Sequence, residues 1–281
     1  MAWNQIQSSY PSVLRGTNQQ TATGLLWQPP SMVSVSSSRI TGTIDRATFR
    51  EGVAIRRFTL HNRSGGTASC GIGFRLQNRF WVAGQITAAG VFTDDTADAQ
   101  SATANDFPLG ANAVNDGFVI ASPVPFGWVS INVGTAEVDA AAADLDHAVS
   151  YSNAAGTGWT ALGSNAALTD QFTTTNAVYA TGALEFVWLP PSDWGKVTAI
   201  STIPVGWYAL RVLAASTAVN DTAALANTIE VGTLQAVEGV VDNGLLAQDW
   251  TTYSEPKADA VVAYFSTANA GNYVIAEVTT S

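Results

Sequence analysis

The sequence contains little cysteine and no long apolar run. Its one cysteine, Cys70, excludes a disulfide or a cysteine-based zinc site within the chain, and its neighbours predict a small buried hydrophobe. No run approaches the ~18 consecutive apolar residues of a membrane-spanning helix. Residues 1–5 lack the basic and apolar segments of a signal peptide. We therefore expect a protein that folds in a cytoplasm, without a membrane partner.

Charged side chains are scarce as well. Only 12% of the 281 residues are charged, against roughly 25% in an average globular protein, while 47% are hydrophobic. The hydrophobic fraction excludes general disorder, and a chain of this length buries a core without a metal or a disulfide. The surface must therefore consist largely of small uncharged residues, which is typical of extracellular assemblies and particle shells.

Motifs for catalysis and cofactor binding are missing. The two histidines, His61 and His147, lie far apart without a histidine or cysteine neighbour in sequence, so no zinc site is indicated. The sequence contains no Gly-x-Ser-x-Gly elbow, phosphate-binding loop or dinucleotide-binding fingerprint. We therefore predict no catalytic, cofactor-binding or metal-binding residues and no enzymatic activity.

The acidic residues leave two alternatives open. Asp94, Asp95 and Asp98 lie in one polar segment, but their spacing does not match a calcium-binding loop, so a solvated acidic loop is the preferred interpretation. The 22 acidic residues also permit a carboxylate pair for glycoside hydrolysis. Nothing in the sequence marks out two of them.

Charge is distributed unevenly along the chain. Residues 1–80 contain nine arginines, no lysine and two acidic residues, whereas residues 81–281 contain three basic residues and twenty acidic ones. Because arginine is favoured where planar contacts to carboxylates form at interfaces, we interpret the basic third as a docking surface and the acidic remainder as a solvated surface. Alternatively, the two parts neutralise each other within one fold. The net charge of −10 argues against nucleic-acid binding.

The hydrophobic pattern indicates an all-β fold. Short segments rich in β-branched and aromatic residues recur about every 8–15 residues, separated by Gly, Asn and Asp turns, and helical periodicity is almost absent. This pattern predicts antiparallel β-sandwich or jelly-roll-like sheets in two β lobes, plus an extended N-terminal arm. The expected divisions are residues 1–45 for the arm, 46–115 for a first lobe completed by 229–281, and 116–228 for a β-sandwich module.

The arm and the arginine-rich segment supply the candidate partner-docking residues. Residues 1–45 are polar and rich in turn formers, which favours an extended segment with one short strand at residues 32–35. Tryptophans in alternating segments are expected in the core, namely Trp81, Trp128, Trp188 and Trp207. Tryptophans in irregular segments suit intersubunit anchors instead. The candidate docking set is Arg15, Arg39, Arg46, Arg50, Arg56, Arg57, Trp3 and Trp27.

Seven short motifs follow one another in the middle of the chain. They are residues 116–122 (DGFVIAS), 125–131 (PFGWVSI), 149–153 (VSYSN), 158–162 (GWTAL), 181–186 (TGALEF), 191–194 (PSDW) and 206–212 (GWYALRV). This ordered series resembles a β-sandwich module that recurs in structural proteins of tailed bacteriophages. Residues 168–173 stand where that module usually has Asp-Gly-Thr. The resemblance implies a virion role and carries over packing residues only, with no catalytic residue.

The resemblance and the charge pattern together lead to a functional hypothesis. We expect a non-enzymatic virion protein, namely a capsid-bound auxiliary such as a decoration, cement or head-surface protein, that is made in the bacterial host cytoplasm and docks through its arginine-rich third. Its expected partners are other virion proteins of the capsid or tail and further copies of itself. The alternative is a tail, fibre or head-spike protein that binds a host-surface glycan. A polysaccharide-degrading enzyme is a third hypothesis, which release of reducing ends would support.

Overall fold

The fold is all-β, with antiparallel sheets. The structure, a computed structural model, describes residues 12–17, 32–38, 43–49, 53–101, 106–109, 115–138, 147–163, 167–170, 179–214, 223–249, 260–266 and 272–280. Within these ranges the strands pair with antiparallel neighbours, and helical structure is limited to two short turns. The predicted class, an antiparallel all-β sandwich, is therefore confirmed.

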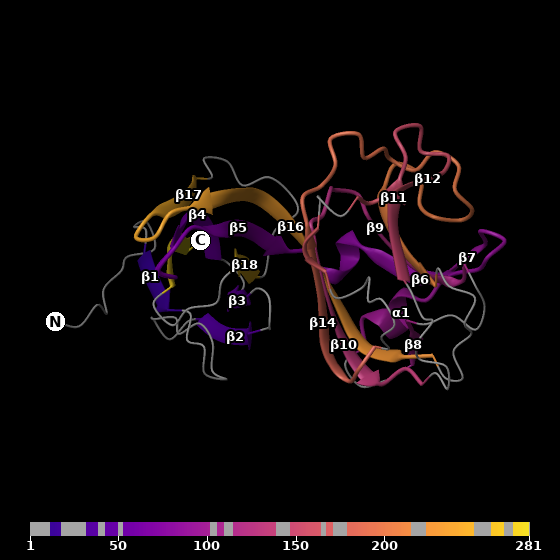
Figure 1. The fold of residues 1–281 in the computed structure, drawn as a ribbon, viewed down its shortest axis with the longest axis horizontal. Coiled ribbons are helices and arrows are strands. Elements are labelled where there is room, and N and C mark those ends of the chain that lie inside the picture. Colours follow the sequence, from indigo (N-terminus) through magenta and orange to yellow (C-terminus); the bar gives the residue numbers. More distant parts are fainter. Residues whose placement is uncertain are drawn as a thin grey trace. The chain divides into compact units, whose positions relative to one another are not determined.

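The chain divides into two compact units (Figure 1), unit 1 with residues 1–77 and 234–281 and unit 2 with residues 78–233. The described strands of unit 1 are β1 Ser12–Thr17, β2 Met32–Ser38, β3 Thr43–Phe49, β4 Val53–His61, β5 Ala68–Arg75, β17 Leu245–Asp249, β18 Ala260–Phe265 and β19 Tyr273–Thr280. The described elements of unit 2 are η1 Asn78–Phe80, β6 Val82–Ile86, β7 Phe92–Asp94, α1 Thr96–Ala99, β8 Phe107–Pro108, β9 Gly117–Ser122, β10 Trp128–Thr135, β11 His147–Ser152, β12 Trp159–Ala161, β13 Ala167–Asp170, β14 Gly182–Trp188 and β15 Tyr208–Ala214. Strand β16, Leu225–Val240, begins in unit 2 and ends in unit 1.

Unit 1 incorporates much of the predicted N-terminal arm. Its sheets follow the order β1-β19-β4-β17 and the order β5-β18-β3-β2, with β16 beside β5. Strand β1 lies opposite residues 273–278 of β19, and β2 pairs along its whole length with β3. Residues 12–17 and 32–38, within the segment expected to form an arm, therefore pair as strands of unit 1, and β2 contains the short strand expected at residues 32–35. The partner of β1 comes from the far end of the chain, so the local pattern gave no sign of that pairing.

The predicted lobe boundaries also differ from the observed ones. Residues 78–115 belong to unit 2, because β6 pairs with β9 and β7 pairs with β6. At the other end, the C-terminal part of unit 1 begins at residue 234 rather than 229. Residues 225–232 of β16 pair with β10 and so remain in unit 2. Long-range strand pairing, which the local pattern does not encode, moves both boundaries.

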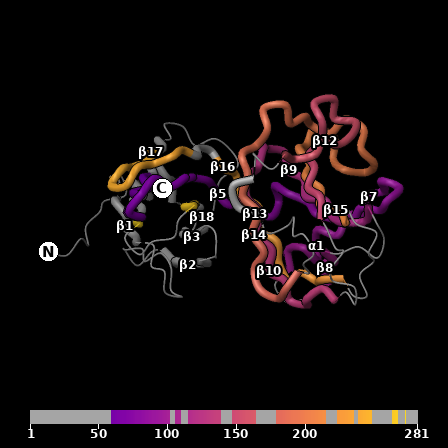
Figure 2. Tube along the Cα trace, viewed as in Figure 1, coloured from indigo at the N-terminus to yellow at the C-terminus, as the bar shows by residue number. Residues whose placement is uncertain are grey.

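Unit 2 contains two antiparallel sheets. One follows the order β12-β11-β15-β9-β6-β7, and the other includes β13-β14-β10-β16, with β8 also on β16. Figures 1 and 2 show β10 and β14 on one side of this unit and β7 and β12 on the other. On one face of the six-stranded sheet, a core cluster joins strand residues to the segment between β14 and β15. Its members are Ile86, Phe92, Val119, Ala121, Val197, Ile200, Ile203, Ala209 and Leu213.

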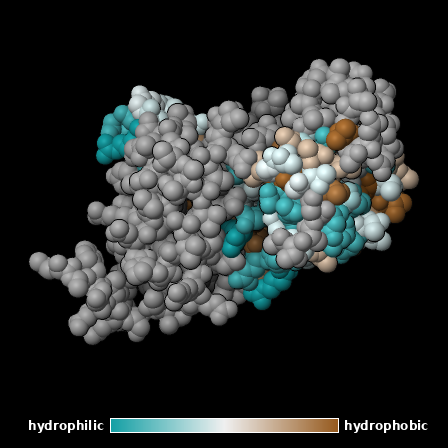
Figure 3. All heavy atoms as spheres, turned by 90° about the horizontal axis from the view of Figure 1, so that it is seen from below, coloured by the Kyte–Doolittle hydropathy of each residue, from teal (hydrophilic) through white to brown (hydrophobic). Residues whose placement is uncertain are grey.

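Apolar residues on the described surface are scattered. The exposed large hydrophobic residues are Val91, Val138, Leu189, Val205, Val241 and Leu245. On the face that Figure 3 shows, the described apolar residues form small patches separated by hydrophilic ones. Within the described ranges, no helix has the length and hydrophobicity needed to cross a membrane.

Candidate functional site

Several residues of the sequence motifs meet around the buried side chain of Ser152 in β11. Its hydroxyl donates a hydrogen bond to the Gly195 carbonyl oxygen at 2.6 Å. The same oxygen accepts hydrogen bonds from Trp194 Nε1 at 3.0 Å and from the Ala209 amide at 3.2 Å. One hydroxyl therefore ties together the 149–153 hairpin strand, the 191–194 turn and β15, and its hydrogen-bonding capacity is fully used.

The indole of Trp194 forms the centre of an aromatic cluster. Its ring centroid lies 5.1 Å from Phe126, 6.2 Å from Trp188 and 5.7 Å from Tyr208. Tyr151 completes the group at 6.2 Å, and its hydroxyl donates to an Asp193 carboxylate oxygen at 3.0 Å. Trp194 itself is 7% exposed. These motif residues pack the interior of unit 2, so here the motifs serve the fold rather than a reaction.

One pair of motif residues lies nearer the surface. Arg211 in β15 places its Cζ atom 4.6 Å from the ring centroid of Trp159 in β12, and its Nε donates to Ser150 Oγ at 3.3 Å. Both side chains of the cation–π pair are half-buried. Burial lowers the pKa of Arg211 to about 10, so the guanidinium remains charged at neutral pH.

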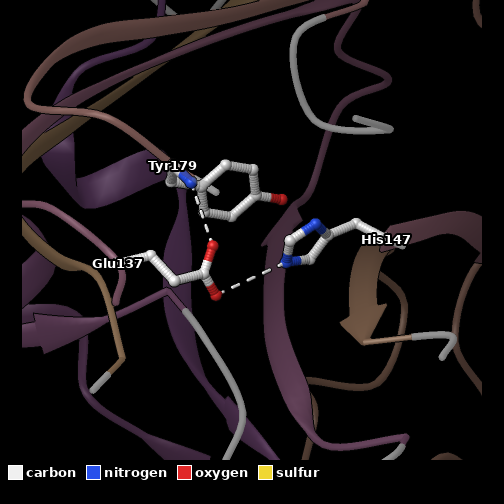
Figure 4. A network of polar contacts seen from close by, with 3 residues as sticks. All are labelled: Glu137, His147 and Tyr179. Atoms are coloured by element: carbon white, nitrogen blue, oxygen red, sulfur yellow. Dashed lines mark hydrogen bonds and ion pairs between the residues drawn. The ribbon is translucent and has the colours of Figure 1, made fainter. Parts of the chain in front are cut away.

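A second polar network joins Glu137, His147 and Tyr179 (Figure 4). The Tyr179 amide donates to Glu137 Oε2 at 2.9 Å, and the Glu137 amide donates to the Tyr179 carbonyl at the same distance. His147 Nε2 lies 3.9 Å from Glu137 Oε1, and its ring stacks on Tyr179 with centroids 4.2 Å apart. All three residues are buried. The carboxylate therefore connects the chain before residue 139 to the chain after residue 178.

The acidic segment predicted as a solvated loop lies at β7 and α1. Asp94 accepts hydrogen bonds from the amide and hydroxyl of Thr96. Burial raises the pKa of Asp95 to about 6, helped by a hydrogen bond and charge from Asp98 and by the charges of Asp106 and Asp94. Within the described part of the chain, no group of three or more potential ligand side chains is placed to hold a metal ion.

The raised pKa of Asp95 predicts a pH-dependent stability. Because its pKa is about 6 in the folded chain and 3.8 as the ordinary value, its contribution to stability is present near pH 4 and lost as the pH rises towards 6. We expect Asp95→Asn to match the wild type near pH 4 and to exceed its urea midpoint above pH 6. Glu238→Gln, at an exposed position of unit 1, is the control for the loss of one carboxylate. An unchanged slope in Asp95→Asn would contradict the assignment.

The structure places four of the eight predicted docking residues. Arg15 lies in β1 opposite Ile275, and Arg46 lies in β3, in a different sheet. Arg56 and Arg57 lie in β4. The remaining four, Arg39, Arg50, Trp3 and Trp27, fall outside the described residues. The described arginines therefore belong to two sheets of unit 1 rather than to one strand or one sheet.

Arg56 and Arg57 differ in the residues that lie opposite them on the neighbouring strands. Arg57 stands directly opposite Glu277 of β19 on one side and Asp249 of β17 on the other. Arg56 has no opposite residue on β19, because the register shifts there from Arg57 to Ile55 and leaves it as the extra residue of a β-bulge. Opposite charges directly across a ladder stabilise a sheet. The register therefore places Arg57 opposite two acidic positions and Arg56 opposite none.

The charges are distributed differently between the two folded units than between residues 1–80 and residues 81–281. Unit 1 contains nine basic and eight acidic residues, because its C-terminal segment adds six acidic residues to the arginine-rich one. Unit 2 contains three basic residues and fourteen acidic ones. The basic residues of unit 1 are thus neutralised within that unit, whose net charge is +1, while the net charge of unit 2 is −11.

Comparison with known proteins gives no family for this chain. No protein-family model matches it, and no curated protein matches it. A solved structure of infectious bursal disease virus, Gt strain, shares 8% identity over 99% of this chain and 83% of that chain, with a TM-score of 0.17. A likeness at this level carries no argument about fold or function.

Two of these arrangements were missed by the sequence analysis. Glu137, His147 and Tyr179 span 42 residues with no spacing that predicts a contact. Trp159 and Arg211 each appear in a motif, but nothing in either motif says that the two side chains stack. The sheet order β12-β11-β15 would have been needed to predict this contact, since it places β12 and β15 on the two sides of β11.

Proposed function

We propose that this chain is a non-enzymatic structural protein of a bacteriophage virion, and specifically a capsid-bound auxiliary that docks through unit 1. The observation that carries the proposal is that the motif residues around Ser152 and Trp194 pack the interior of unit 2. They are buried and hydrogen-bonded to one another, as expected of a module whose recurring sequence encodes packing. The ordered resemblance to the phage module supplies the virion context.

The different net charges of the two units support different roles for them, solvent exposure for unit 2 and docking for unit 1. Unit 2, with fourteen acidic and three basic residues, is suited to remain solvated. Unit 1 is close to neutral and holds the arginine-bearing strands β1, β3 and β4. The mechanism is passive, since buried interface area and charge complementarity hold the protein on its partner, another virion protein or a further copy.

Charge reversal tests this docking role. We expect Arg15→Glu combined with Arg56→Glu to reduce incorporation into particles at least tenfold, because neither residue is opposite an acidic one in the described register. Arg57 stays unchanged, because Arg57→Glu would place three acidic residues side by side and weaken the sheet. Incorporation is measured by electron cryomicroscopy and mass spectrometry of purified particles.

Exposed Arg79 in unit 2 provides the matched control, as Arg79→Glu. It changes the net charge in the same direction and should leave incorporation intact. Normal incorporation of the Arg15/Arg56 double variant, with its fold preserved by circular dichroism, would count against docking through unit 1. Absence of the wild-type chain from particles would overturn the virion role itself.

A tail, fibre or head-spike adhesion protein is the second candidate. The observation that favours it is the half-buried pair of Trp159 and Arg211 on the six-stranded sheet of unit 2. Glycan-array binding by the purified chain, with the chain located on the tail, a fibre or a spike of the particle and not across the capsid surface, would favour this role over the capsid-bound one.

A further inference from the structure

Arg211 occupies an unusual position for a cation. It lies on the third strand of the six-stranded sheet, directly opposite the fully buried Val119. Two residues away on either side along β15 lie Ala209 and Leu213, both members of the buried core cluster on this face. Desolvating a charged group among apolar neighbours is unfavourable unless a counter-charge or strong hydrogen bonds compensate it.

The fold supplies only part of that compensation. Ser150 Oγ accepts one of the five N–H groups of the guanidinium, and the Trp159 ring covers one side. Among the described residues, no carboxylate forms an ion pair with Arg211, although unit 2 contains fourteen acidic residues. Burial, with no contribution from a neighbouring charge, accounts for the lowered pKa of Arg211.

The outer end of the guanidinium reaches solvent. Neither Nη atom of Arg211 is among the buried side-chain nitrogens that lack a hydrogen-bond partner. The positions beside it are small and open, since Ala148 and Ala161, the neighbours of Ser150 along β11 and across to β12, are exposed. The guanidinium and the half-buried Trp159 indole thus reach the surface together, whereas Ser150 is buried.

We propose that Arg211 and Trp159 form a binding site for a sugar ring that carries a carboxylate. The guanidinium fork matches the two oxygens of a carboxylate and the indole offers an apolar surface to the ring, while the buried Ser150 hydroxyl holds the guanidinium through its Nε atom. One guanidinium and one indole are enough to contact a single saccharide residue, whereas a protein partner requires roughly 800 Å² of matched surface. Sugar binding at this site does not depend on where the chain lies in a particle. It can therefore be refuted while docking through unit 1 is confirmed, or the reverse.

The alternative role for Arg211 is packing, in which its aliphatic stem covers the cluster and its charge is incidental. Arg211→Met separates the two roles, because it keeps an unbranched apolar stem and removes the fork. Arg79→Met is the matched control, since Arg79 also lies over an aromatic ring in unit 2, with Cζ 4.6 Å from the centroid of Phe80.

The test titrates the full chain with D-glucuronate and with oligogalacturonate by calorimetry and NMR. We expect saturable binding of the acidic sugars, at least tenfold weaker binding of their methyl esters, and shifts centred on the Trp159 indole resonance. Arg211→Met should lose at least tenfold in affinity with the melting temperature unchanged or raised, and Arg79→Met should bind as the wild type does. Arg211→Lys, which keeps the charge but loses the fork, should bind more weakly than the wild type.

Several results would overturn the proposal. They are no saturable binding of either acidic sugar by the wild type, equal affinity for acids and esters, or undiminished binding by Arg211→Met. An acidic peptide that binds where the sugars do not would make the pair a protein contact and would also overturn it. If Arg211→Met fails to fold, Arg211→Lys and the Trp159 shifts in the wild type decide the outcome.

Discussion

Replacing Trp194 with alanine is expected to lower the free energy of unfolding of unit 2 by about 3–5 kcal/mol. The indole is 7% exposed and contacts four aromatic rings. Its Nε1 also donates to Ser152 Oγ and to the Ala209 carbonyl oxygen at 3.2 Å. Truncation would therefore leave a cavity and remove a hydrogen-bond donor from a buried site. Urea unfolding, followed by far-ultraviolet circular dichroism, measures the loss.

Two further variants show whether the loss of stability depends on the position of the tryptophan or on the chemical groups of its side chain. Trp207→Ala removes the same side chain from a half-buried position at the edge of the core cluster and should lose clearly less stability. Trp194→Phe keeps an aromatic ring and removes the Nε1 donor, so its loss should fall between that of Trp194→Ala and the wild type. Equal losses for Trp194→Ala and Trp207→Ala would contradict the central role assigned to Trp194.

The sequence predicted the elements of this fold better than their partners. Alternating apolar residues identified strands such as β14 and β15, because strand periodicity is local. The prediction that Trp81, Trp128 and Trp188 lie in the core is confirmed, with at most 1% of each exposed. Trp207 is half-buried and packs at the edge of the cluster.

Strand partners were not predictable in the same way. Strand β1 pairs with β19, at the opposite end of the chain, and β6 pairs with β9 across an intervening helix and loop. Register in such pairs is set by burial across the whole sheet, and a local pattern carries no record of it. The pairing of β1 with β19 and the place of residues 78–115 in unit 2 were not expected for this one reason.

The distribution of charge between the two units was not predictable from the local sequence either. A division of the linear sequence at residue 80 makes the first part strongly basic, but folding brings in a C-terminal segment with six acidic residues. Arg57, which stands between Glu277 and Asp249, is the clearest case. Neutralisation within the fold, the alternative considered from the sequence, therefore describes unit 1 as a whole. The docking proposal therefore rests on the arginines that have no acidic residue opposite them in the strand register.

Gly156→Ala is expected to destabilise unit 2 by about 2–5 kcal/mol, combining a left-handed backbone conformation with a steric overlap. Gly156 has φ of +70° in the turn between β11 and β12. A Cβ there would overlap the Lys196 carbonyl oxygen and lie 2.9 Å from the Thr198 amide nitrogen. The Gly156 carbonyl also accepts hydrogen bonds from the amide and hydroxyl of Thr198. The overlap therefore cannot be relieved without moving the segment that covers the core cluster.

Gly90 provides the matched control within the same unit. Its φ is +78°, yet a Cβ there meets nothing within 4 Å. Gly90→Ala should therefore lose only the conformational part, about 1–2 kcal/mol. The difference between the two urea midpoints isolates the contact between the β11–β12 turn and the segment that joins β14 to β15. If the two variants unfold at the same urea concentration, that contact contributes nothing, and the packing proposed for the motif residues would have to be assigned to the aromatic cluster alone.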